Sequence, residues 1–170
     1  GAEQRITDLP EYAELYEQYP GTDWRRVGRS FPGTDLVPAF AGAEENLLCF
    51  DEDRYQGEDD FVRSFALTIR RFGLDAVDPA TSQAITQAYG RAIAQGLWTN
   101  TLAEINDDEY WMEGTQSFFD ANLEDDSEDR PPNSSHNAID TREELREYDP
   151  SLWTILASVY GDTDWRPTCP

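Results

Sequence analysis

Glu109 and Glu113 are the residues whose type and spacing most directly suggest chemistry. They stand four positions apart, so a helix would place both carboxylates on one face, beside Tyr110 and Trp111. Two acids arranged in this way can serve as a general acid and base or as metal ligands. The polar face of an amphipathic helix has the same pattern, and on spacing alone it is the better interpretation.

A second group of acids lies between Asp51 and Asp60 and invites a calcium interpretation, since calcium binds carboxylate and carbonyl oxygens. An EF-hand loop that began at Asp51 would need Gly at its sixth position and Glu at its twelfth. Gln56 and Val62 stand there instead, so the loop is not an EF-hand. Two interpretations of this loop remain: it binds calcium weakly, or it is a solvated loop. In the second, the acids at 58–60 stabilise the N-terminus of the following helix through its dipole.

His136 is the single histidine of the chain. A Ser-His-Asp triad would have to use it, and its neighbours give no support for one. A zinc site built from several histidines is excluded. The polar sequence around it, Pro132 to Asn137, predicts a solvent-exposed loop residue.

Charge narrows the classes of partner. The 170 residues carry a formal net charge of −22, and all 13 basic residues are arginine. Such a field repels nucleic acid and anionic lipid and attracts cations, basic proteins and mineral surfaces. A chain without lysine cannot form a Schiff base with a substrate. No run of about 18 apolar residues is present, so no membrane span is expected.

Several signs favour a secreted, extracellular glycoprotein. Cys49 and Cys169 are the two cysteines, and their separation suggests one disulfide that fixes the C-terminal tail. Asn133-Ser134-Ser135 is an N-glycosylation sequon in a polar loop.

The hydrophobic pattern predicts a single, mostly helical α+β domain over 1–170 with a small N-terminal sheet. Helices are expected from about 8 to 19, over 57–72 with Gly73 as its end, over 79–96 after the cap Asp78, over 107–123 after the cap Asn106, from 141, and over 150–161. Short strands are expected at 26–29, 36–40 and 47–50. Residues 124–137 are expected to form a mobile acidic loop and 162–170 an extended tail.

These elements carry a resemblance that spans about two thirds of the chain, from about Leu47 to Arg166. The segment resembles a family of small secreted-type zincin metallopeptidases that are related to the catalytic domain of anthrax lethal factor. The matching stretches are Arg54-Tyr55-Gln56-Gly57-Glu58, Phe72-Gly73-Leu74-Asp75, Glu109-Tyr110-Trp111-Met112-Glu113-Gly114, Gln116-Ser117-Phe118-Phe119, Asn137, Asp140-Thr141-Arg142-Glu143-Glu144-Leu145, Tyr148-Asp149-Pro150 and Gly161-Asp162-Thr163-Asp164-Trp165-Arg166.

The resemblance implies a metal site that has been lost. In such enzymes the helix at 57–72 carries His-Glu-x-x-His, whose histidines bind zinc and whose glutamate activates water. This chain has Arg63, Ser64 and Leu67 at those positions and keeps the downstream ligand, Glu109. The resemblance therefore implies a pseudoenzyme without zinc and without catalytic residues. We expect Arg63 to pair with Glu109, because a guanidinium can replace the charge of the missing metal.

The leading hypothesis is thus a secreted, catalytically inactive, metallopeptidase-like binding protein. Its ligand would be an apolar or pigment-like small molecule in the former active-site cleft, or a protein partner; that cleft could equally have closed into core. The cleft residues are expected to be Arg63, Ser64, Leu67, Glu109, Tyr110 and Glu113. Two alternatives remain: an acidic extracellular protein that binds calcium or mineral, and a hydrolase with a rebuilt carboxylate site.

Overall fold

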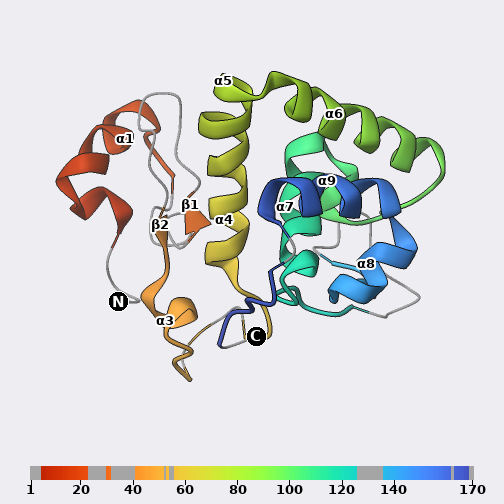
Figure 1. The fold of residues 1–170 in the computed structure, drawn as a ribbon. Coiled ribbons are helices and arrows are strands. Elements are labelled where there is room, and N and C mark those ends of the chain that lie inside the picture. Colours follow the sequence, from red (N-terminus) through yellow and green to blue (C-terminus); the bar gives the residue numbers. More distant parts are fainter. Residues whose placement is uncertain are drawn as a thin grey trace.

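A computed structural model gives the fold, and its description covers residues 5–22, 30–31, 41–51, 53, 56–125, 136–161 and 163–168. This part of the chain is mostly helical, as predicted (Figure 1). None of the helices found in these residues combines the length and apolar composition that crossing a membrane requires.

The N-terminal elements are short. Their bounds are η1 Ile6–Asp8, η2 Pro10–Tyr12, α1 Ala13–Gln18, β1 Ser30–Phe31, β2 Ala41–Gly42 and α3 Glu44–Leu47. The strands β1 and β2 pair antiparallel, with Ser30 opposite Gly42. They lie beside α4 on the side away from α7 (Figure 1).

Longer helices form the rest of the molecule. Their bounds are α4 Asp60–Thr68, η3 Ile69–Leu74, α5 Asp75–Val77, α6 Pro79–Ala94, η4 Leu102–Glu104, α7 Asp107–Phe118, α8 Arg142–Tyr148 and α9 Pro150–Tyr160. Helix α7 packs against α4 on one side and against α6, α8 and α9 on the others (Figure 1). Its central place explains why Trp111, Phe118 and Phe119 are buried.

Side-chain caps set the starts of the main helices. Asp78 accepts a hydrogen bond from the Thr81 backbone N–H and precedes Pro79, and Asn106 accepts one from the Glu109 N–H; both caps confirm the prediction. Asp149 caps α9 in the same way. Each cap satisfies a backbone donor that the first turn leaves unpaired.

Some predicted boundaries are wrong. The first α-helix begins at Ala13 rather than near residue 8, because two 3-10 turns precede it. Residues 47–50 form no strand, since the N–H groups of Leu47 and Leu48 bond back to Ala43 and Glu44 in a helical turn. Helix α7 ends at Phe118 rather than near 123. The predicted strands at 26–29 and 36–40 lie outside the described residues.

Gly73 does not end its helix. The chain continues through it as the π-helix η3, Ile69–Leu74, and then as α5. Arg70 gives the physical reason: its buried guanidinium forms ion pairs with Asp107 and Asp108 at 2.6 and 3.0 Å. These contacts hold the segment against the start of α7, and tertiary contacts of this kind override a local glycine signal.

The predicted apolar stripe of α4 is also different. The recurrence of Phe61, Phe65, Ile69 and Phe72 at helical spacing predicts one apolar face, but the buried apolar residues of α4 are Val62, Ala66 and Leu67. Phe65 is 44% exposed. The large side chains therefore lie on a second face of α4, where they do not pack into the main core.

The close contact of α7 with α9 depends on Gly114. A Cβ atom there would lie 2.3 Å from Leu152 Cδ2, inside the packed core. We expect Gly114→Ala to destabilise the fold by about 1–3 kcal/mol, because the core must shift to admit the methyl group. Urea unfolding followed by circular dichroism would measure this loss.

Gly90→Ala is the matched control for that substitution. Gly90 lies inside α6, and a Cβ atom there would meet no described atom within 4 Å. Alanine is the better helix former there, so stability should stay equal or rise by up to about 1 kcal/mol. Equal losses for the two variants would contradict the close packing inferred at Gly114.

Candidate functional site

Charged side chains from distant parts of the sequence meet between α4 and α7. We call Glu58, Arg63, Glu109, Glu113 and His136 the buried ion cluster. Glu58 precedes α4, Arg63 lies in it, both later glutamates lie in α7, and His136 lies in the described segment before α8. Ion-pair contacts join all five side chains into one network.

Arg63 forms ion pairs with both glutamates of α7. One terminal nitrogen pairs with Glu109, which confirms the predicted contact. The other lies 3.0 Å from Glu113 Oε2 and donates a longer bond, at 3.4 Å, to Gln116 Oε1. The guanidinium therefore fixes α4 to α7 through two carboxylates, a geometry that suits its planar fork of donors.

Glu113 is the most enclosed member of the cluster, with a fully buried side chain. Arg63 faces one carboxylate oxygen, and His136 Nδ1 and Asn122 Nδ2 lie 2.8 and 3.0 Å from the other. Burial alone would raise the pKa of Glu113, but the bond from His136 and the charge of Arg63 hold it below its usual value. Glu113 is thus an ionised, fully partnered group.

His136 is buried rather than exposed, so the sequence-based expectation for it is wrong. Its Nδ1 lies 2.8 Å from Glu113 and its Nε2 lies 3.3 Å from Glu58. A ring with a carboxylate at each nitrogen carries both protons. Burial opposes that charge, but the two carboxylates outweigh it and raise the pKa of His136 to about 9.

The acids at the start of α4 also differ from the prediction. The loop pattern predicts that Glu58, Asp59 and Asp60 are solvated, but each is less than a tenth exposed. Asp59 accepts a hydrogen bond from the Val62 N–H and so caps α4. Glu58 faces His136, a contact that no local pattern could have indicated because the two residues are far apart in the sequence.

The predicted cleft residues do not line one open cleft. Arg63, Glu109 and Glu113 come together, whereas Ser64 and Leu67 are buried on α4. Tyr110 is fully buried on another side of α7, and its hydroxyl donates to Asp149 at 2.7 Å. Burial of these side chains favours the closed alternative over an open former active site.

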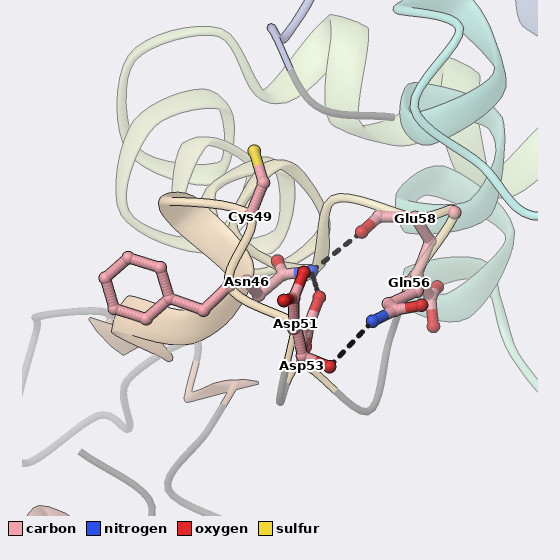
Figure 2. A pocket seen from close by; sticks show the side chains of 8 residues that line it. Asn46, Cys49, Asp51, Asp53, Gln56 and Glu58 are labelled. Atoms are coloured by element: carbon pink, nitrogen blue, oxygen red, sulfur yellow. Dashed lines mark hydrogen bonds between the residues drawn. The ribbon is translucent and has the colours of Figure 1, made fainter.

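An acidic pocket of about 270 Å³ lies beside α3 and contains part of the predicted calcium loop (Figure 2). The Asn46 amide donates to Asp53 Oδ2 at 2.9 Å and to the Glu58 carbonyl at 2.8 Å. Gln56 Nε2 donates to the Asp51 carbonyl. Amide N–H donors thus occupy oxygens that a cation would need. Among the residues with described positions, no three acids, histidines or cysteines converge on a metal position.

A second cavity, of about 390 Å³, lies against the face of α4 that carries Phe61 and Phe65. We call it the aromatic pocket. The large side chains that line it come from α4, the start of η3, the end of α7, α9 and the C-terminal tail: Phe61, Phe65, Ile69, Phe119, Tyr160 and Trp165. Asp59 also lines it. The sequence did not indicate this site, because the helical spacing of the α4 aromatics is also typical of core residues.

The tail forms one wall of the aromatic pocket. Trp165 packs edge-on against Phe119, with ring centroids 5.3 Å apart. Arg166 forms an ion pair with Asp120, and Arg142 Nη1 donates to the Thr163 carbonyl at 2.7 Å. Residues 163–168 form no helix or strand. The contacts of Trp165, Arg166 and the Thr163 carbonyl hold this segment against the helices.

No family model, no curated protein and no solved structure matches this chain. Three sequence-based expectations concern positions outside the described residues: the glycosylation of Asn133, the pairing of Cys169 with Cys49, and most of the acidic loop, at 126–135. They stay predictions.

We predict that Arg63→Met destabilises the protein by about 3–5 kcal/mol, because the buried Glu113 would lose one of its two cationic partners and Glu109 would lose its ion pair. Chemical unfolding would measure the loss. Arg71→Met is the matched control: Arg71 is 43% exposed and pairs with Asp108, so its loss should cost less than about 1 kcal/mol. Equal effects of the two substitutions would refute the role given to Arg63.

The raised pKa of His136 predicts a pH dependence of stability. Its charge stabilises the folded state fully below the unfolded pKa near 6.5, and that contribution disappears as the pH rises through about 9. The shift corresponds to about 3 kcal/mol. Proton NMR gives the titration directly, since the chain has one histidine. A midpoint at or below 6.5 would contradict the double carboxylate contact.

Proposed function

We propose that this protein is a secreted, catalytically inactive, zincin-like binding protein that holds an apolar small molecule in the aromatic pocket. The observation that carries the proposal is the pocket itself: about 390 Å³ enclosed largely by aromatic and aliphatic side chains. Cavities of this size and lining are the usual sites of small apolar ligands.

Two residues with hydroxyl groups, Thr115 and Tyr160, also line the pocket. The Tyr160 hydroxyl is buried; burial raises the pKa of Tyr160, and a hydrogen bond with Thr115 lowers it in part. Thr115, on the same wall, directs its own hydroxyl to the Trp111 carbonyl at 2.7 Å.

The zincin resemblance enters the proposal through Arg63. Its guanidinium lies between Glu109 and Glu113, where the resemblance implies a metal. A fixed cation at that point supports the loss of zinc chemistry, because the carboxylates are already neutralised. It also weakens the case for a rebuilt carboxylate hydrolase, since Glu113 is fully buried among its partners and Glu109 is engaged in an ion pair with Arg63.

The ligand site proposed here differs from the cleft that the sequence suggested. The residues of that expected cleft lie on α4 and α7 around Arg63, whereas the pocket uses Phe61, Phe65 and Ile69. Successive helical residues point about 100° apart, so the two sets occupy different faces of α4. The buried ion cluster holds one face of α4 against α7, and the opposite face of α4 borders the pocket that binds the ligand.

Binding of an apolar fluorescent probe, N-phenyl-1-naphthylamine, tests the proposal. We expect Phe65→Glu to weaken binding at least about tenfold, because it places a carboxylate among the apolar walls. Val77→Glu adds the same charge at a site that is 82% exposed and should leave the affinity unchanged. Mass spectrometry of denatured natural protein would identify the ligand itself.

An absence of probe binding to the parent protein, or equal binding by both glutamate variants, would overturn the assignment. One bound zinc ion per protein molecule together with peptidase activity would contradict the proposal that the protein is catalytically inactive.

A further inference from the structure

Asp59 is an acid inside an apolar site. It is 7% exposed and lines the aromatic pocket. Its Oδ1 accepts a hydrogen bond from the Val62 N–H at 3.0 Å. A carboxylate can accept about four hydrogen bonds, so this cap leaves it capacity for a further donor.

The acidic charges near Asp59 are unfavourable to it, and Arg166, which lines an adjacent pocket with Asp59, pairs with Asp120. Burial raises the pKa of Asp59, the backbone N–H groups of Val62 and Phe61 lower it in part, and the nearby charges of Asp53 and Glu58 raise it again. Both of these neighbours have the same sign as Asp59. A cation that entered the pocket would therefore relieve repulsion as well as form a new ion pair.

The other walls suit the same kind of ligand. Phe61, Phe65, Phe119 and Trp165 line the same pocket as Asp59 and supply aromatic rings to its walls. Aromatic faces attract organic ammonium groups through their quadrupoles, by about 0.5–2 kcal/mol for each well-placed ring. The net charge of −22 also concentrates cations at the surface of the protein.

We infer that the ligand of the aromatic pocket is an organic ammonium ion, whose apolar body lies among the aromatic side chains and whose charged nitrogen contacts the Asp59 carboxylate. This inference rests on the proposed function, since it names the chemical class of the ligand for the same pocket. It goes beyond that function because a neutral apolar molecule would fill the cavity without using Asp59.

Calorimetry with two matched probes tests the inference. 2-Naphthylmethylamine is protonated near neutral pH, and 2-naphthylmethanol has the same ring system without the charge. We expect the parent protein to bind the amine at least about tenfold more tightly. Asp59→Asn should abolish this preference and leave the affinity for the alcohol within about twofold, because asparagine still caps α4.

Asp78→Asn is the matched control, since Asp78 caps α6 in the same manner and does not line the pocket. It should keep the full preference for the amine. Equal affinities of both probes for the parent protein, or an unchanged preference in Asp59→Asn, would overturn the ammonium inference and leave the apolar pocket standing. Failure of both probes to bind would overturn the pocket and the inference together.

Discussion

The guanidinium of Arg63, fixed between Glu109 and Glu113, is the contact on which the arrangement of the central helices depends. A fully buried carboxylate such as Glu113 is stable in the fold only if cations and hydrogen-bond donors surround it. Arg63 and His136 supply those charges from distant parts of the sequence. The cluster therefore ties the start of α4, the middle of α7 and the segment before α8 into one unit.

This arrangement explains why α4 can have two different faces. Ion pairs and core packing hold the face of α4 that carries Arg63 and Leu67 against the rest of the protein. Phe61 and Phe65 can then border a cavity instead of filling the core. A scaffold whose stability comes from one side of a helix is suited to bind a ligand on the other side.

Local signals in the sequence were sufficient for part of this structure. Asp78-Pro79 and Asn106 mark helix starts through hydrogen bonds that span three residues, and the Arg63–Glu109 pair followed from charge and a family resemblance. The burial of His136 was not predictable, because its partner Glu58 is distant in the sequence. The continuation through Gly73 depends on Arg70 reaching across to α7. The aromatic pocket was missed for a related reason: helical spacing shows that Phe61 and Phe65 share a face but not what that face contacts.

A crystal structure with anomalous data collected at the zinc edge, from crystals grown with zinc, tests the central claim most directly. We expect the Arg63 guanidinium to lie between Glu109 and Glu113, with no anomalous peak within bonding distance of either carboxylate. A zinc ion held by both glutamates, with Arg63 turned toward solvent, would contradict this claim.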